Sequence, residues 1–244
     1  MLYALLDWLN QNYAPPGFGA FDFITTRTAL AAVTSLIISL IIGRKMIHWL
    51  QKLQLKEVIR ADIGLDSHLS KANTPTMGGV IIILATLIPA LLWMNMNSIY
   101  TWMSIFVMFI LGVVGFIDDY IKVVKKDKSG LHGWFKIGGQ VFVGLVLGAA
   151  LYFWPAFDDF NTLSTVPFVK DVNIDYAFFG EEYGWLIYIP FVIFIITAVS
   201  NAANLTDGLD GLLSGTSAIA GVILGIFAYV SGRVDFSNFL DLIY

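Results

Sequence analysis

Two adjacent aspartates, Asp118 and Asp119, stand at the end of an apolar run in the string GFIDDY. Neighbouring carboxylates repel each other, and the C-terminal end of a helix disfavours negative charge. A cation should therefore compensate the pair. Nearby lysines (122, 125 and 126) would do so if this is an ordinary solvated loop start. A divalent metal is the alternative: oxygen ligands suit Mg²⁺, which typically binds one or two carboxylates together with substrate phosphates.

A second polar cluster lies in the string NAANLTDGLDG, where four amide or carboxylate residues recur at every third position: Asn201, Asn204, Asp207 and Asp210. Side chains three apart share a helix face, although the face drifts by about 60° at each step. Gly208 and Gly211 would let the helix unwind so that all four converge. Polar groups beside an apolar span are expected to line a cavity or an interface. The alternative is a polar connecting turn with aspartate caps.

The third cluster is the string SHLSKANTPTMGG at residues 67–79. Lys71 offers a mobile positive charge to a phosphate group. The hydroxyls of the string and Gly78-Gly79 can donate to an anion near the N-terminus of the helix that follows. An ordinary membrane-entry loop with a Thr-Pro helix start is the alternative. The string lacks a Walker pattern, which excludes the loop of a nucleoside triphosphatase.

The elements that must position these clusters are apolar helices. Hydrophobic residues make up 57% of the 244 residues, charged residues only 13%, and the mean hydropathy is +0.76. Six segments approach the roughly 20 residues that cross a bilayer: 24–43, 77–95, 99–117, 135–153, 185–203 and 212–231. We therefore expect an all-α, polytopic transmembrane helical bundle with six spans, forming a single integral membrane domain over 1–244. The net charge of −4 excludes a basic nucleic-acid binder, and the lack of Cys excludes disulfides and thiolate metal sites.

Two further patterns concern packing. The first 13 residues place leucines at helical spacing without a basic leader, which predicts an interfacial helix ending at Pro15-Pro16-Gly17. Three glycine pairs have the small-xxx-small spacing that lets two helices approach closely in lipid: Gly144/Gly148, Gly211/Gly215 and Gly221/Gly225.

The basic residues predict the orientation in the membrane. Segments 43–76 and 118–136 hold eleven of the 14 basic residues: Arg44, Lys45, Lys52, Lys56, Arg60, Lys71, Lys122, Lys125, Lys126, Lys128 and Lys136. Cytoplasmic loops are enriched in Lys and Arg. Segment 154–184 is acidic, so we place it outside together with the N-terminus. All three polar clusters then face the cytoplasm.

The strings SHLSKANTPTMGG, GFIDDYIKVVKKD (115–127) and NAANLTDGLDGL (201–212) resemble the polyprenyl-phosphate N-acetylhexosamine-1-phosphate transferases, in order and in register. The first string is similar in particular to the bacterial members that act on UDP-MurNAc-pentapeptide. The resemblance implies a ten-helix fold in the bacterial inner membrane with both termini outside. It also implies transfer of phospho-MurNAc-pentapeptide to undecaprenyl phosphate, which gives lipid I and UMP and requires Mg²⁺. A second copy of the chain, in a homodimer, is a further expected partner.

Site residues carry over by motif. Catalysis and Mg²⁺ binding would fall to Asp118 and Asp119, with Asp118 the base if one acts; a covalent aspartyl-phosphate route stays open. Substrate binding would fall to residues that match the family's loop and its NxxDxxD pattern: Lys71, Thr76, Asn204, Asp207 and Asp210.

The chain departs from the family pattern in one respect. It stops at Tyr244 after six spans, whereas the family's C-terminal part supplies a further acidic Mg²⁺ ligand and a histidine-rich loop. We therefore expect either part of a longer chain or a form without full activity. The alternatives are a sibling transferase that uses UDP-GlcNAc, and an incomplete fragment with a structural role. A secondary transporter is disfavoured, because its binding groups would lie near the bilayer midplane.

Overall fold

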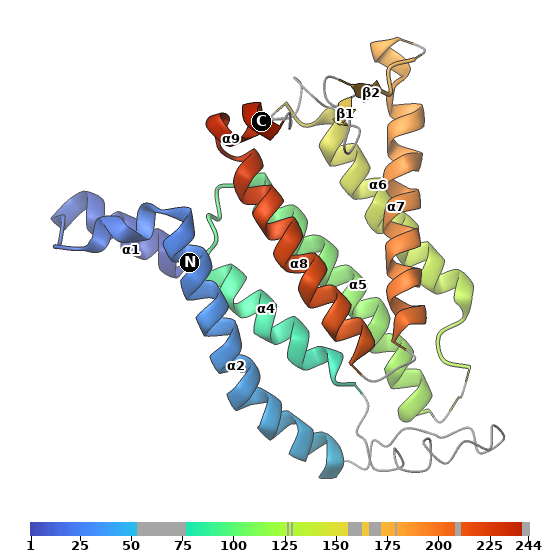
Figure 1. The fold of residues 1–244 in the computed structure, drawn as a ribbon. Coiled ribbons are helices and arrows are strands. Elements are labelled where there is room, and N and C mark those ends of the chain that lie inside the picture. Colours follow the sequence, from blue (N-terminus) through green and yellow to red (C-terminus); the bar gives the residue numbers. More distant parts are fainter. Residues whose placement is uncertain are drawn as a thin grey trace. The chain divides into compact units, whose positions relative to one another are not determined.

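The computed structural model describes residues 1–52, 77–125, 127, 129–155, 163–165, 172–178, 180–207 and 211–240. The described residues are almost entirely helical (Figure 1). The helices are α1 (Leu2–Tyr13), α2 (Ile24–Lys52), α4 (Gly79–Trp93), α5 (Ile99–Val123), α6 (Gly133–Phe153), α7 (Trp185–Thr206), α8 (Leu212–Ser231) and α9 (Val234–Leu240), with short 3₁₀ turns at Phe18–Asp22 and Glu181–Tyr183. The strands β1 (Leu163–Thr165) and β2 (Asn173–Asp175) form an antiparallel pair.

Each of the six apolar segments predicted from the sequence contains a helix. Five of these helices, α2, α5, α6, α7 and α8, are long and apolar enough to cross a membrane by length and composition. Helix α4 has 15 residues, which corresponds to about 22 Å and is shorter than a hydrocarbon core of about 30 Å. The prediction of an all-α polytopic membrane bundle is confirmed, whereas helix length alone does not fix the number of spans.

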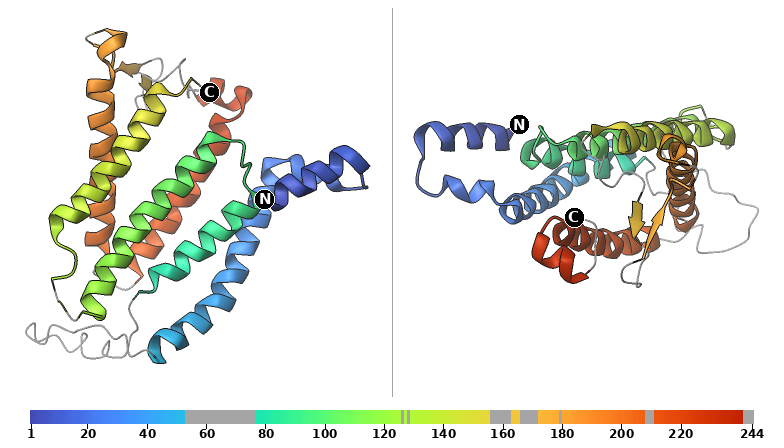
Figure 2. Two further views of the ribbon diagram at one scale, coloured as in Figure 1. Left: turned by 180° about the vertical axis from the view of Figure 1, so that it is seen from behind. Right: turned by 90° about the horizontal axis from the view of Figure 1, so that it is seen from above.

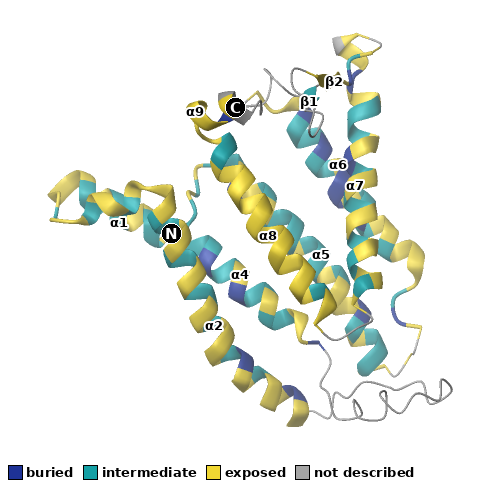
Figure 3. Ribbon diagram, in the orientation of Figure 1, coloured by how far each residue is buried: buried dark blue, intermediate teal, exposed yellow. Residues whose placement is uncertain are grey.

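Many large apolar residues are exposed on the helices. Figure 3 colours much of α2 and α8 as exposed. Phe194 of α7 is 67% exposed and Leu224 of α8 is 66% exposed, although both sit in the middle of apolar helices. Water would make such surfaces unfavourable, because the exposure of apolar area costs free energy in proportion to that area. Lipid tails remove this cost, so the distribution of apolar side chains agrees with a bilayer as the solvent.

The chain divides into two compact units, and the first comprises Met1–Gly139. Here α4 packs against both α2 and α5, and both views of Figure 2 place α4 beside α2. The indole N–H of Trp93 donates a hydrogen bond of 3.1 Å to the hydroxyl of Thr34, which joins α4 to α2. The predicted N-terminal helix is confirmed as α1, which ends at Tyr13 and is followed by Ala14 in a left-handed conformation with φ 42°. Its interfacial position stays a prediction.

In the second unit, Gln140–Tyr244, glycines bring α6 and α7 into close contact. A Cβ atom added at Gly144 would lie 2.7 Å from the Cα atom of Ile193, and one at Gly148 would lie 3.3 Å from the Cα atom of Ile189. The predicted close helix packing is therefore confirmed at Gly144 and Gly148. It is not seen at the pairs Gly211/Gly215 and Gly221/Gly225, where no described atom lies within 4 Å of an added Cβ. The β1–β2 pair in the polar segment before α7 was not predicted, because three-residue strands are too short to show an alternating pattern.

The close approach of α6 and α7 makes Gly144 sensitive to the smallest enlargement. We expect Gly144→Ala to lower the free energy of unfolding by about 1–3 kcal/mol, because the new methyl group overlaps backbone of Ile193. Gly221→Ala in α8 is the matched control, since no described atom lies within 4 Å of its added Cβ. Alanine favours a helix over glycine, so this control should be unchanged or slightly stabilised. Thermal unfolding in one detergent measures both; equal midpoints for the two variants would contradict the packing argument.

Candidate active site

The carboxylate of Asp118 is buried and held between two lysines. Helix α5 carries Asp118 near its C-terminal end, where the residue is only 7% exposed. Lys122, one turn later on the same helix, places its Nζ atom 2.6 Å from Oδ2 of Asp118. Lys136, in the first turn of α6, places its Nζ atom 2.8 Å from Oδ1. Charge-assisted pairs of this length are among the stronger polar contacts in proteins. Asp118 is therefore an ion-paired residue of the protein interior.

A glycine allows the backbone to close over the same carboxylate. The backbone N–H of Leu131 donates a hydrogen bond of 2.8 Å to Oδ1 of Asp118. Gly130, which precedes it, has a φ of 65°, in the left-handed region that favours glycine. A Cβ atom at Gly130 would also lie 2.5 Å from Oδ1 of Asp118 and 2.6 Å from Cε of Lys122. Both the conformation and the space therefore require glycine at this position.

The connection between α5 and α6 is fixed by its own hydrogen bonds. Asp127 accepts hydrogen bonds from the hydroxyl of Ser129 at 2.6 Å and from its backbone N–H at 3.0 Å. These bonds lower the pKa of Asp127, because they stabilise the ionised carboxylate. The N–H of Gly130 in turn donates to the carbonyl of Asp127 at 3.1 Å. This turn brings the start of α6, and with it Lys136, to the end of α5.

The predicted compensation of the aspartate pair by cations is confirmed for Asp118, and the partners are lysines. The alternative of a solvated loop start neutralised by lysines is confirmed for the pairing with Lys122 and wrong for the solvation, because the Asp118 side chain is buried. The sequence reasoning identified Lys122 but missed Lys136, whose contact depends on the turn at 127–131. Lys125 is exposed and has no ion pair with a described residue. Asp119 is half-buried.

The described donors around Asp118 bear on whether this carboxylate could hold a metal ion. Among the described residues, no three side chains of His, Asp or Glu gather closely enough to hold a metal ion. An ionised carboxylate offers about four acceptor positions, and Asp118 already uses three of them for Lys122, Lys136 and the N–H of Leu131. Two ammonium groups at this distance also repel a divalent cation. The residues around Asp118 therefore fit a magnesium ion poorly.

The second cluster begins with a structural residue. The amide of Asn201 donates to Oε1 of Gln140 at 3.0 Å and to the carbonyl of Thr197 at 2.8 Å. Gln140, 6% exposed, donates in turn to the hydroxyl of Ser200 at 3.0 Å. Asn201 therefore satisfies buried polar groups where α6 meets α7. Part of the third-residue pattern in this string serves helix packing.

Two further members of that cluster, Asn204 and Asp207, lie where α7 ends. Asn204 is exposed on the last turns of α7, and the exposed Asp207 ends the helix with its N–H bonded to the carbonyl of Ala203 at 3.1 Å. Helix α8 starts after Gly211, whose φ is 79°. The predicted interruption of the helix at this point is therefore confirmed at Gly211. Asp210 lies outside the described residues.

Two predicted substrate residues, Lys71 and Thr76, also lie outside the described residues. The residue that follows them, Met77, is buried at 9% exposure and has a φ of 69°. A non-glycine residue in the left-handed region is strained by about 1–3 kcal/mol, and such strain gathers at functional sites. Met77 therefore marks the entry to α4 as a constrained point that sequence reasoning missed. Asp118 and Asp207 belong to different units, so their predicted common cleft stays a prediction.

The long apolar helices indicate a multi-pass membrane protein. Its candidate site is polar and charged, with an aspartate buried between two lysines at the end of one helix. Comparison with known families identifies the family within this class. Residues 100–243 match the family described as Glycosyl transferase family 4, and residues 71–83 match Phospho-N-acetylmuramoyl-pentapeptide-transferase signature 1. The chain belongs to the glycosyl transferase family 4.

Curated relatives cover the whole chain. A phospho-N-acetylmuramoyl-pentapeptide-transferase of Salinibacter ruber is 49% identical over 100% of this chain and 65% of its own length. Relatives with the same name from Flavobacterium johnsoniae and Chloroherpeton thalassium are each 45% identical over 100% of the chain, with 67% and 64% of their own lengths covered. The chain thus spans about 65% of the length of the curated relatives it matches.

Lys136 pairs with the buried Asp118 and Lys125 does not, so substitutions of these two lysines should differ in their effect on stability. We expect Lys136→Gln to lower the free energy of unfolding by about 1–2 kcal/mol, because a buried carboxylate loses one of its two cationic partners. Lys125→Gln removes the same charge from an exposed position and should leave stability nearly unchanged. Thermal unfolding at low and high salt measures both. Indistinguishable unfolding curves for the two variants would show that the buried ion pair contributes nothing.

Proposed function

We propose that the protein to which this chain belongs transfers phospho-MurNAc-pentapeptide from UDP-MurNAc-pentapeptide to undecaprenyl phosphate, giving lipid I and UMP. The observation that carries this proposal is the match of residues 71–83 to the phospho-N-acetylmuramoyl-pentapeptide-transferase signature. Relatives named for this transferase align with the whole chain, which supports the same reaction. A sibling that uses UDP-GlcNAc would be expected to share the acidic motifs, so the signature is what separates the two.

The physical problem of this reaction is to bring two phosphates together. A phosphate monoester has a second pKa of about 6, so the lipid phosphate is mostly dianionic at neutral pH. Neutralisation and alignment are therefore needed more than a strong base. Lys122 and Lys136 are suited to this work, because Asp118 holds both ammonium groups in place before substrate arrives. Each ammonium has three donors, so each can keep Asp118 and still reach a phosphate oxygen.

The two aspartates then take different parts. Asp118 orients the lysines, and its two ion pairs together with the N–H of Leu131 leave only one of about four acceptor positions open for a proton. Asp119 is the better candidate to hold Mg²⁺, together with substrate phosphates and groups beyond the described residues. When bound, Mg²⁺ supplies neutralisation of the pyrophosphate and of the leaving UMP. Nucleotide-sugar binding is assigned to the motif residues: Lys71, Thr76, Asn204, Asp207 and Asp210.

The same proposal includes location and assembly. The basic segments 43–76 and 118–136 support an inner-membrane protein whose active site faces the cytoplasm and whose N-terminus lies outside. The acidic segment 154–184 then has no part in the chemistry. A homodimer stays a prediction from the family resemblance.

Substitution of the aspartates in the complete enzyme tests the reaction. Asp118→Asn and Asp119→Asn keep the side-chain volume but remove the charge, so turnover should fall by about two orders of magnitude or more in each. KM for the nucleotide-sugar should change far less, since its proposed ligands are untouched. Only Asp119→Asn should raise the Mg²⁺ concentration needed for half-maximal rate. Asp235→Asn, in the first turn of α9, is the matched control. The measurement is UMP release across Mg²⁺ concentrations. Near-normal turnover of both variants at every Mg²⁺ concentration would refute the proposal.

The orientation can be tested independently, because the chain has no native Cys. Glu182→Cys and Lys125→Cys each introduce one thiol at an exposed position of the described chain. In intact spheroplasts, an impermeant maleimide should label the first and spare the second until the membrane is permeabilised, because basic segments stay in the cytoplasm. Labelling of Lys125→Cys with protection of Glu182→Cys would reverse the orientation.

A further inference from the structure

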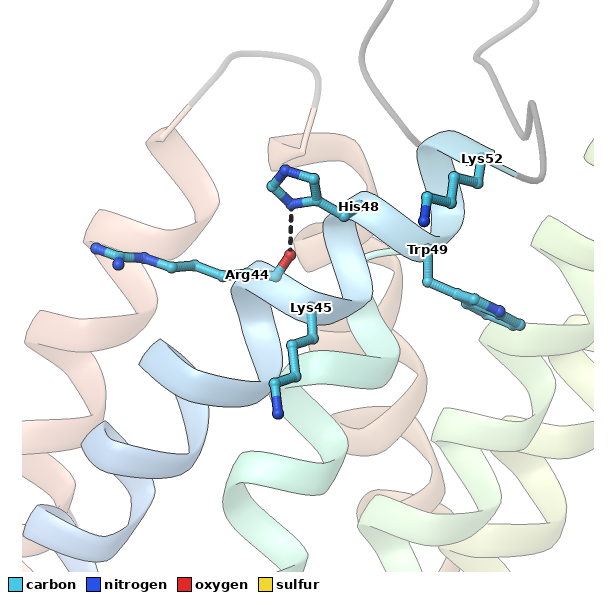
Figure 4. A pocket seen from close by; sticks show the side chains of 5 residues that line it. All are labelled: Arg44, Lys45, His48, Trp49 and Lys52. Atoms are coloured by element: carbon cyan, nitrogen blue, oxygen red, sulfur yellow. Dashed lines mark hydrogen bonds between the residues drawn. The ribbon is translucent and has the colours of Figure 1, made fainter.

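A basic surface to which the proposed transfer reaction assigns no role lies at the C-terminal end of α2. It is a shallow depression of about 330 Å³, and its side chains are drawn in Figure 4. We name it the α2 basic surface, and its residues are Arg44, Lys45, His48, Trp49 and Lys52. All five are exposed. This surface lies wholly within the unit Met1–Gly139.

Helix geometry directs this surface away from α4. At 3.6 residues per turn, its five residues fall within an arc of about 140° around the axis of α2. The opposite side carries Gly43 and Leu50, which are buried; a Cβ at Gly43 would lie 3.7 Å from Ile81 of α4, and Leu50 is 3% exposed. The packed side and the basic side of α2 are thus separate.

The end of α2 reaches a membrane surface. Its 29 residues extend about 43 Å, which exceeds a hydrocarbon core of about 30 Å. The last turns, which carry the basic residues, therefore lie at the level of the headgroups. The ring of Trp49 is 55% exposed there, and tryptophan is enriched at this depth because its ring is amphipathic.

The part of the chain that the structure describes leaves the cations of this surface open to an external anion. Among the described residues, none forms an ion pair with Arg44, Lys45 or Lys52, in contrast to the lysines that hold Asp118. The Nδ1 atom of His48 donates to the carbonyl of Arg44 at 2.9 Å, which fixes the ring on the same surface (Figure 4). A helix C-terminus attracts cations only weakly, with an equivalent of about half an elementary charge. The three cationic side chains of Arg44, Lys45 and Lys52 are more than the partial negative charge of the helix C-terminus needs.

Apolar side chains directly below the cations decide what kind of anion fits. Ile37 and Ile41 lie within the same arc of α2, one to two turns nearer the N-terminus, and are 49% and 55% exposed. A ligand that follows this face of α2 therefore needs a negative head and an apolar tail. We propose that the α2 basic surface binds the phosphate headgroup of an anionic phospholipid, whose acyl chains lie along Ile37 and Ile41. Clusters of Lys and Arg beside a span attract such lipids.

Quenching of Trp49 by brominated lipids tests this proposal on the full chain in nanodiscs. The signal of Trp49 is the difference between the native chain and Trp49→Phe. At equal mole fraction and low salt, brominated phosphatidylglycerol should quench Trp49 at least about three times as efficiently as brominated phosphatidylcholine. The reason is that the cations concentrate the anionic lipid around α2. At about 1 M salt, where the Debye length is about 3 Å, the preference should fall.

Matched variants separate charge from other effects. Arg44→Gln/Lys45→Gln/Lys52→Gln should reduce the quenching by phosphatidylglycerol to the level of phosphatidylcholine. Arg44→Lys/Lys45→Arg/Lys52→Arg keeps every charge and should keep the preference. If the triple glutamine variant loses helix by circular dichroism, Lys52→Gln alone gives the same comparison with a smaller expected decrease.

Several outcomes would overturn the proposal. Equal quenching by the two lipids in the native chain would exclude an anionic-lipid site, as would an unchanged preference in a folded triple glutamine variant. Loss of the preference on addition of inorganic phosphate at constant ionic strength would assign the surface to a soluble anion. Displacement of phosphatidylglycerol by an equal amount of undecaprenyl phosphate would assign it to the lipid carrier. None of these measurements uses UMP release, so their failure is distinct from failure of the proposed transfer reaction.

Discussion

A carboxylate buried at the end of an apolar helix needs counter-charges from the protein, because neither lipid tails nor a dry interior solvate it. Asp118 meets this requirement with Lys122 and Lys136. The rest of the local structure follows from the second of these pairs. Lys136 belongs to the next helix, so α5 must be followed by a turn that brings α6 back to it, and Gly130 is the residue whose backbone allows that turn. The charge balance of one side chain thus constrains the connection between two membrane helices.

The lipid solvent also determines how the other helices pack. Apolar association in lipid gains little, so close contact between helices depends on small residues and on buried polar bonds. Where α6 meets α7, Gly144 is the small residue that permits close contact. Gln140 forms the buried polar bonds there, with Asn201 and Ser200. The unit Met1–Gly139 uses a comparable bond between Trp93 and Thr34. Each unit therefore combines wide apolar faces with a few specific polar contacts.

Sequence patterns predicted the helices well, because long apolar runs are a local property. Glycine spacing predicted less, since only Gly144/Gly148 of three equally spaced pairs makes a close contact among the described residues. The need for a cation near Asp118 was also predictable, since it follows from charge alone. The identity of Lys136 was not, because 18 positions of chain and a glycine turn separate it from Asp118. Asn201 shared the spacing of a ligand set, yet its partner Gln140 lies on another helix, and spacing carries no information about that. Met77 gave no signal, since strain in the backbone has no counterpart in residue type.

The adjacency of Asp118 and Asp119 becomes intelligible from helix geometry. Successive residues of an α-helix point about 100° apart, so two neighbouring aspartates cannot share one environment. The first enters the turn at Gly130 and is 7% exposed, whereas the second is half-buried. Because Lys122 and Lys136 neutralise Asp118, that carboxylate adds little repulsion to its neighbour. The two lysines thus remove most of the electrostatic cost of placing two carboxylates side by side.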